Sequence, residues 1–236
     1  MLTPWIAAIA VGVAVALSGC SVIAAPAGGS RARVVEPPAS SAVPLSCTYS
    51  ENTEGDVVRE VTPPSPDPAV DGKPMIAGIS TNLGIIEIKL DGEAAPCAVA
   101  SFRHLAGEHF YDRSPRHRLT TQSIWVLQCG DPSGTGTGGP GYKYDDENLP
   151  EGESPAYPKG TVAMANAGPG TNGSQFFICY RDNPLPASYS VMGTVTKGLD
   201  IVEKVAAAGT DDKNGPGDGT PKRPISITSV TVRPAS

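Results

Sequence analysis

The chain has 236 residues, a formal net charge of −6 at pH 7, 27 glycines, 24 prolines and 6% aromatic residues. This length allows one or two domains, and the many glycines and prolines favour one compact domain with long loops and a tail. The net negative charge argues against nucleic acid as a partner, because nucleic-acid binding requires clustered lysine and arginine side chains.

The first 20 residues contain an apolar segment that ends near a cysteine. Residues 5–17 are apolar throughout, which is shorter than the roughly 20 residues of a transmembrane helix and typical of a signal peptide. Residues 17–20 have the sequence Leu-Ser-Gly-Cys, which resembles a bacterial lipobox. We therefore predict a signal peptide over residues 1–19, a lipid on Cys20, and a membrane-anchored protein on the extracytoplasmic face. An uncleaved anchor helix is the alternative, because no lysine or arginine precedes the apolar residues.

Residues 20–74 are rich in proline, alanine, serine and glycine and contain few large apolar side chains. Such a segment cannot bury enough surface to order itself, so we predict a disordered, semi-extended tether. Cys47 and Tyr49 interrupt this composition and suggest a point where the tether is pinned to the domain. The folded domain is expected to occupy residues 75–236.

Four cysteines remain besides Cys20, namely Cys47, Cys97, Cys129 and Cys179. In an exported chain they favour disulfide bonds, and the sequence leaves three connectivities open. Because Cys47 lies in a segment without a core of its own, we expect it to form a disulfide with the domain. A zinc site is disfavoured, since no Cys-x-x-Cys pair occurs and the three histidines lack ligand spacing.

The domain begins with strands and then an amphipathic helix. Residues 75–80 and 84–90 flank a turn, and residues 84–90 alternate in the way typical of a strand with one solvated face. Pro96 opens a helix, where its missing N–H is no loss, and apolar residues follow at three- and four-residue spacing. Later segments predict strands at 124–127, 191–195 and 225–232 and a helix at 198–208. Many short strands with two helices indicate an antiparallel barrel.

The stretch 164–180 places a polar loop between two apolar strands. Residues 160–165 and 175–180 are rich in β-branched and aromatic side chains, whereas the glycines and asparagines between them form turns. Buried strands hold such a loop rigidly, so it can present Asn166 and Gln175 to a ligand. A long hairpin without a function is the alternative.

A second set of motifs accompanies this stretch. In chain order the set contains His117-Arg118, residues 128–131 (Gln-Cys-Gly-Asp), the glycine-rich residues 134–141, and Asp146-Glu147-Asn148. Together with residues 164–180, these motifs resemble the cyclophilins, the peptidyl-prolyl cis-trans isomerases of the cyclosporin-binding type. The resemblance extends from about residue 75 to residue 232. It implies a mainly β fold, with a closed eight-stranded antiparallel barrel capped by two α-helices.

The resemblance implies that Arg118 and Gln128 are catalytic and that neither a metal nor a cofactor takes part. It also implies a set of substrate-binding residues: Trp125, Val126, Ala165, Asn166, Gln175, Phe177, Leu185 and Tyr189. Core packing is the alternative for Trp125, because large aromatic side chains dominate cores. Residues 119–123 include about two more residues than the family pattern, which leaves the reach of Arg118 open. Tyr189 stands where many members have histidine, and Pro184 where a tryptophan is common.

The glycine-rich residues 134–141 do not indicate a nucleotide site. They lack the Gly-Lys-Ser/Thr ending of a phosphate-binding loop, and no helix N-terminus follows them. Asp145, Asp146 and Glu147 come next and would repel a phosphate.

The implied function is isomerisation of X-Pro bonds in exported proteins, by a monomer whose partners are proline-containing segments. Rotation about the bond must break amide resonance, with a barrier of about 18–20 kcal/mol, but cleaves nothing and needs no nucleophile. The alternative is a proline-peptide-binding or chaperone module with weak or no turnover. The extra residues after Arg118 and the changes at Pro184 and Tyr189 favour this alternative.

Overall fold

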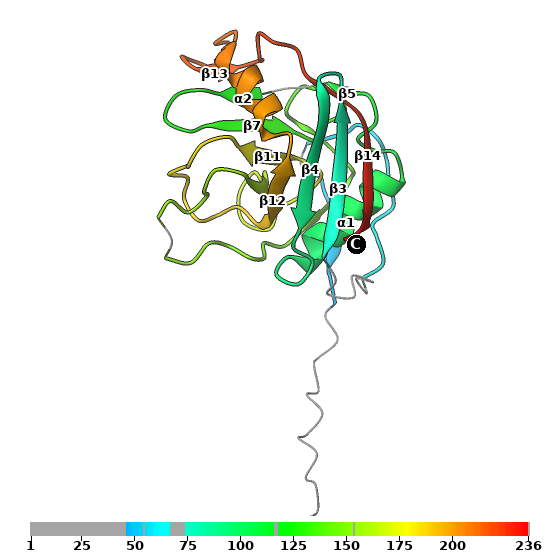
Figure 1. Ribbon diagram of the computed structural model, residues 1–236. Coiled ribbons are helices and arrows are strands. Elements are labelled where there is room, and N and C mark those ends of the chain that lie inside the picture. Colours follow the sequence, from blue (N-terminus) through cyan, green and yellow to red (C-terminus); the bar gives the residue numbers. More distant parts are fainter. Residues whose placement is uncertain (1–45, 54, 67–73, 116–117, 153, 236) are drawn as a thin grey trace, which may run out of the picture. The chain divides into compact units, whose positions relative to one another are not determined.

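The computed structural model describes residues 46–235, apart from residues 54, 67–73, 116–117 and 153 (Figure 1). The predicted signal peptide, Cys20, Arg116 and His117 lie outside the described residues. Within the described part of the chain, no helix is both long enough and apolar enough to cross a membrane.

Most of the domain is built on one sheet of ten strands. The strands are β3 (Met75–Thr81), β4 (Gly84–Leu90), β5 (Ser114–Pro115), β6 (Arg118–Thr120), β7 (Val126–Cys129), β10 (Thr161–Met164), β11 (Phe176–Cys179), β12 (Val191–Lys197), β13 (Asp218–Gly219) and β14 (Ser226–Pro234). Their order is β13-β6-β7-β11-β10-β12-β4-β3-β14-β5, and every neighbouring pair is antiparallel. Figure 1 shows β4, β3 and β14 side by side, with the predicted hairpin joining β3 to β4.

The sheet curls but stays open, so the expected closed eight-stranded barrel is wrong. Among the described residues, the outermost strands β13 and β5 pair with β6 and β14 and not with each other. Each outermost strand has two residues, and Pro115 in β5 has no N–H to offer a further strand. Edges this short supply too few hydrogen bonds to close the sheet.

Helices α1 (Pro96–Gly107) and α2 (Leu199–Ala207) confirm the two helices that the sequence predicts. Ala95, which precedes α1, provides no side-chain cap. Glu147 supplies one instead, because its Oε1 accepts the N–H of Ala98, 49 positions earlier in the chain, at 2.6 Å. The motif at residues 146–148 therefore includes a distant cap for the first turn of α1.

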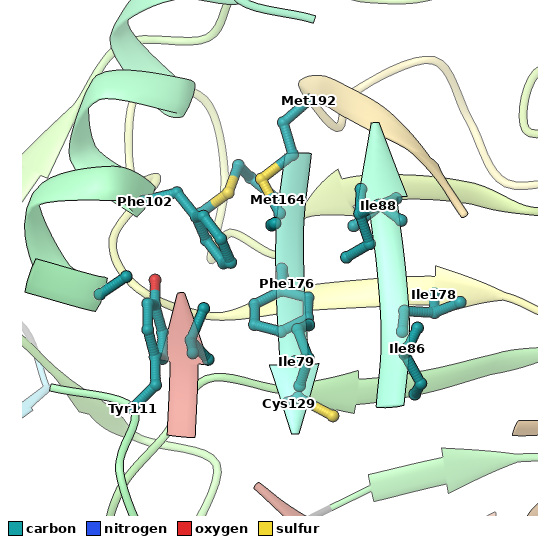
Figure 2. Close-up of a cluster of buried hydrophobic side chains, with 14 of the residues drawn as sticks. Ile79, Ile86, Ile88, Phe102, Tyr111, Cys129, Met164, Phe176, Ile178 and Met192 are labelled. Carbon is teal, nitrogen blue, oxygen red and sulfur yellow. The ribbon is translucent and has the colours of Figure 1, made fainter. Parts of the chain in front are cut away.

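The main core lies between α1 and the inner face of the sheet. Phe102 of α1 and Phe176 of β11 meet edge to face with ring centroids 5.5 Å apart, and Tyr111 packs against both rings. Figure 2 shows these three rings beside Ile79 of β3 and Met164 of β10. Only alternate residues of β7, β10 and β11 belong to this core, so their other residues face the opposite side of the sheet.

Residues 46–66 belong to the domain, although we expected a disordered tether up to residue 74. In this segment β1 (Tyr49–Glu51) pairs antiparallel with β9 (Tyr142–Tyr144), and β2 (Asp56–Val57) pairs in parallel with β8 (Gly138–Gly139). A disulfide joins Cys47 to Cys97 in the first turn of α1, which confirms the expected bond between Cys47 and the domain. Composition is misleading here because backbone hydrogen bonds, a covalent bond and a few apolar side chains such as Tyr49 and Val61 are enough to hold the segment.

Thiol counting on a Cys20→Ala variant checks this disulfide. Cys129 and Cys179 are free and buried, and burial raises the pKa of each thiol to about 12. Unreduced, denatured protein should therefore contain two reactive thiols, and reduced protein should contain four. Replacing Cys47 and Cys97 by serine should lower the free energy of unfolding by about 2–4 kcal/mol. Four reactive thiols before reduction would contradict the structure.

Candidate active site

A second apolar cluster lies on the outer face of β7, β10 and β11. Its buried members are Val126, Tyr157, Ala163, Phe177 and Cys179, with Ala156, Ala165, Leu185, Tyr189 and Val191 packed against them. Phe177 and Tyr189 meet edge to face with ring centroids 5.4 Å apart. The structure thus brings together five of the predicted substrate-binding residues: Val126, Ala165, Phe177, Leu185 and Tyr189.

Tyr157 is a buried member of this apolar cluster and was not predicted from the sequence. Its ring is fully buried beside Phe177 and Tyr189. Its hydroxyl accepts the Tyr189 N–H at 2.9 Å and lies 3.2 Å from the carbonyl oxygens of Pro186 and Tyr189. The hydroxyl therefore fixes the segment that carries Leu185 and Tyr189. Nothing in the local sequence around Tyr157 signals this contact, because its partners lie about 30 residues away.

Trp125 does not reach the apolar pocket, contrary to the family-based expectation. Its half-buried side chain packs against the main core and lines a hollow with Tyr180 and the end of α2. The side chain of Asn183 fixes this position, because it accepts the Trp125 N–H at 2.7 Å and donates to the Trp125 carbonyl at 3.0 Å. Core packing, the alternative considered for Trp125, is what the structure shows.

The hairpin of β6 and β7 decides the position of Arg118. Arg118 is paired with Gln128, and Leu119 with Leu127. The extra residues that the sequence suggests are accommodated in the turn beyond this pairing, where the Val126 N–H donates to Oγ1 of Thr120 at 3.1 Å. The additional length therefore does not move Arg118 away from Gln128.

Three polar side chains form a continuous row across β6, β7 and the start of β11. Nη1 of Arg118 donates to Oε1 of Gln128 at 3.3 Å, and Nε2 of Gln128 donates to Oε1 of Gln175 at 2.8 Å. Nε2 of Gln175 in turn donates to the carbonyl oxygens of Gly136 and Gly138 at 2.9 and 3.1 Å. Both amide hydrogens of Gln175 are thus used within the protein, whereas Gln128 keeps one for a ligand.

Asp218 fixes the guanidinium of Arg118 from the opposite side. Its two carboxylate oxygens accept Nε and Nη2 of Arg118 at 2.8 and 2.6 Å, in a bidentate ion pair. The hydrogen bonds raise the pKa of Arg118 against the effect of burial, and they lower the pKa of Asp218. A planar, bidentate pair of this kind restricts the orientation of the guanidinium.

Sequence reasoning missed Asp218. It lies 100 positions from Arg118 in a glycine-rich turn, and only the pairing of β13 with β6 brings the two together. A pairing of two-residue length leaves no periodic pattern in the sequence.

Asn166 is one of the residues that line a groove next to Gln128 and Gln175. Its side chain serves the loop, since Nδ2 donates to the Ser188 carbonyl at 2.9 Å and to Oδ1 of Asp146 at 3.4 Å. The Asp146 carboxylate also accepts the Gly170 N–H and Nδ2 of Asn172, both at 2.9 Å. Asp146 therefore holds the loop between β10 and β11 in shape.

The glycine-rich residues 134–141 enclose a carboxylate of the protein itself. Asp131 accepts hydrogen bonds from the N–H and hydroxyl of Ser133 and from the Gly136 N–H. Burial alone would raise the pKa of Asp131, but these hydrogen bonds outweigh it and lower the pKa. The carboxylate of Asp131 already accepts these donors, so they are not available to a phosphate.

The site combines a cluster of apolar side chains, which suits contact with a proline ring, with one oriented cation. Of the five N–H groups of Arg118, three have partners in Asp218 and Gln128, so two remain for a ligand. Within the described residues, no group of three or more His, Cys, Asp or Glu side chains could hold a metal ion. A curled antiparallel sheet with two helices defines a cyclophilin fold, and Arg118, Gln128 and Phe177 lie together on its outer face.

The chain belongs to the family of cyclophilin-type peptidyl-prolyl cis-trans isomerases. Residues 76–232 match the family model described as "Cyclophilin type peptidyl-prolyl cis-trans isomerase/CLD". A similar solved structure is that of a cyclophilin-type peptidyl-prolyl cis-trans isomerase from Cryptosporidium parvum. It has 28% identity and a TM-score of 0.59, with 69% of this chain and 99% of that chain covered.

Two curated relatives are mycobacterial. The probable peptidyl-prolyl cis-trans isomerase B of Mycobacterium tuberculosis (strain CDC 1551 / Oshkosh) is 44% identical over 194 residues, which cover 72% of this chain. The Mycobacterium leprae protein of the same name is 40% identical over 204 residues, which cover 80% of this chain. The matches span 62% and 67% of the lengths of these two relatives, so part of each relative has no counterpart in the matched region.

The ion pair between Arg118 and Asp218 can be checked by NMR. The Arg118 Nε–Hε group should give a slowly exchanging signal that an Asp218→Ala variant loses. Because the folded-state pKa of Asp218 is lowered, the signal should persist as the pH falls past about 3.9 and disappear at still lower pH, as the carboxylate is protonated. Asp200→Ala is the matched control, since Asp200 pairs with Lys204 on the surface of α2. A signal that survives in Asp218→Ala would show that other groups fix Arg118.

Proposed function

We propose that this protein accelerates cis-trans isomerisation of X-Pro peptide bonds. The observation that carries the proposal is the position of Arg118, fixed by Asp218 and Gln128 beside the apolar pocket around Phe177. One of the similar solved structures, with 29% identity and a TM-score of 0.58, was determined in the presence of the dipeptide Ala-Pro. Membership of the family supports the same activity.

The pocket residues account for binding of the proline ring. Phe177, Leu185 and Tyr189 offer an apolar surface of aromatic and branched side chains, which removes the ring from water. Gln128 retains one amide hydrogen and can donate it to a main-chain carbonyl of the substrate. The proline and its neighbour are thereby held while the remaining chain turns about the C–N bond.

Arg118 accounts for the rate. As the peptide bond twists, resonance is lost and the lone pair becomes localised on the proline nitrogen. A donor with a permanent positive charge interacts more strongly with this nitrogen in the twisted state than in either planar isomer, and only such a difference accelerates the reaction. One charge-assisted hydrogen bond contributes about 1.5–3 kcal/mol, which corresponds to one or two powers of ten in rate. Desolvation and positioning in the pocket supply the rest.

A protease-coupled assay on a short X-Pro peptide tests this function through Arg118. Arg118→Ala should lower kcat/KM by about 10²–10³, with a small change in KM, because the lost interaction is strongest in the twisted state. Arg118→Lys should restore part of the loss, since lysine keeps the charge but not the bidentate geometry toward Asp218. Arg223→Ala is the control, an exposed arginine with the same change in charge. Equal losses in Arg118→Ala and Arg223→Ala would indicate a general electrostatic effect and contradict the assigned role.

A proline-peptide-binding module with weak or no turnover is the second candidate function. Two departures from the family pattern favour it: Tyr189 occupies the pocket beside Phe177, and exposed Pro184 offers no side-chain donor next to Leu185. The same assay separates the two functions, because a binding module would bind the peptide without accelerating isomerisation.

We also propose that the protein is lipid-anchored on the extracytoplasmic face of the membrane, where a monomer would act on proline-containing segments of exported proteins. The apolar residues 5–17 and the lipobox-like residues 17–20 support export and lipidation at Cys20. The disulfide between Cys47 and Cys97 also supports export, because such bonds persist in oxidising compartments.

Mass spectrometry of the Cys20→Ala variant tests the anchor. In the native host, wild-type protein should lose residues 1–19 and carry acyl chains on Cys20, because two or more chains are needed for stable anchoring. The variant should keep the precursor mass and carry no lipid. An exported wild-type protein that retains Met1–Gly19 would contradict the proposal.

A further inference from the structure

The described residues 46–53 and 55–66 form a strap that is closed at its base and reaches the candidate active site at its tip. At the base, the Cys47 N–H donates to the Pro66 carbonyl at 2.7 Å, and the disulfide ties Cys47 to Cys97. At the tip, Asp56 is paired with Gly138. The family match begins at residue 76, so the strap is an addition to the matched domain.

Contacts along both arms hold the strap against the domain. On the first arm, β1 pairs with β9, and the Tyr49 hydroxyl donates to the Cys97 carbonyl at 3.0 Å. On the returning arm, Nη1 of Arg59 donates to the carbonyl oxygens of His109 and Phe110 at 3.1 and 2.6 Å. The tip is therefore supported from two sides and positioned by the base.

The tip of the strap forms one wall of a groove of about 270 Å³. Asn52 and Gly55 line this wall, and the loop that begins at Ala165 lines another. Gln128 and Gln175 belong to the groove and also to the polar row that ends at Arg118. The groove is thus continuous with the candidate active site, and a peptide that places its proline beside Phe177 can extend into it.

Among the described residues, the lining of the groove carries no charged side chain. It is formed largely by glycines, hydroxyls and side-chain amides, such as Gly138, Thr137 and Asn52. Among the described residues at the tip of the strap, Asp56 is an exposed carboxylate at the rim, and it accepts the Thr137 hydroxyl at 2.7 Å. A neutral lining suits main-chain atoms and small polar side chains, while a carboxylate at the rim repels acidic side chains and attracts basic ones.

We propose that the strap completes a peptide-binding subsite next to the proline pocket, and that this subsite selects proline segments flanked by neutral polar or basic residues over acidic ones. The proposal rests on the proposed isomerase function and names its substrate class. The subsite acts on KM, because it holds a part of the peptide that does not rotate, whereas Arg118 acts on kcat.

The first experiment displaces the tip of the strap. Gly55 has φ +96°, and a Cβ there would lie 2.9 Å from the Thr137 carbonyl oxygen, so Gly55→Ala must move the tip away from β8. Gly152→Ala is the matched control, since Gly152 has φ +65° but open space around the new Cβ. Both variants are assayed on a proline tetrapeptide and on octapeptides extended on either side of the proline.

Wild-type protein should show a KM several-fold lower for one octapeptide series than for the tetrapeptide. In Gly55→Ala, the KM for the octapeptides should rise to that for the tetrapeptide, while kcat/KM for the tetrapeptide stays within a factor of two. Gly152→Ala should change neither the KM for the octapeptides nor kcat/KM for the tetrapeptide. Equal KM values for long and short peptides in the wild type, or an advantage that survives Gly55→Ala, would overturn the proposal.

The second experiment tests the charge preference without moving the backbone. Octapeptides that differ only in Lys, Gln or Glu beside the proline segment should bind most tightly with Lys and least tightly with Glu. The dissociation constant should change by steps of about threefold from one peptide to the next at low salt, and by smaller steps at 1 M salt. Asp56→Asn should reduce these steps, and Asp200→Asn on α2 should leave them unchanged. Steps that are absent, or unaffected by Asp56→Asn, would contradict the assigned preference.

Equilibrium titration of the octapeptides separates this inference from the proposed function. If the wild type binds them through the strap but does not accelerate isomerisation, the isomerase function fails and the subsite stands. If the wild type turns over the tetrapeptide and Gly55→Ala binds octapeptides normally, the isomerase function stands and the subsite fails.

Discussion

Alternation of side chains along β7, β10 and β11 is the constraint on which both the core and the site depend. Along β7, Leu127 packs into the main core while its neighbours Val126 and Gln128 face the pocket and the polar row. Along β11, Phe176 packs into the main core, and its neighbour Phe177 packs into the cluster on the opposite face. A slip of one residue in the pairing would bury Gln128 and expose Leu127, so the stability of the core also fixes the geometry of the site.

Carboxylate side chains fix the loops outside this sheet by accepting hydrogen bonds. Asp218 orients Arg118, Asp131 fills the glycine-rich loop, Asp146 holds the loop between β10 and β11, and Glu147 caps α1. Each accepts hydrogen bonds from a segment far away in the sequence or in an irregular conformation. These four of the 24 acidic residues thus serve internal attachment, since a carboxylate satisfies several backbone and side-chain donors at once.

Local sequence patterns made a large part of the fold predictable. Features that depend on contacts between residues far apart in the chain could not be predicted. Pro96 marked the start of α1, and the family motifs identified Arg118, Gln128 and Phe177, which the structure brings together. Trp125 was misplaced because counting along the motif gives its position but not its orientation, which the distant Asn183 decides. Asp218 and the open edge of the sheet depend on strands of two residues, too short to leave a pattern.

The disulfide between Cys47 and Cys97 encloses a sequence separation of 50 residues, which includes the strap and the hairpin of β3 and β4. Any single proteolytic cut between these two cysteines would leave both fragments covalently joined. The amino-terminal fragment would stay attached at α1, and β1 could keep its pairing with β9. A molecule cut between Cys47 and Cys97 would therefore remain one particle and would release its amino-terminal fragment only after reduction of the disulfide.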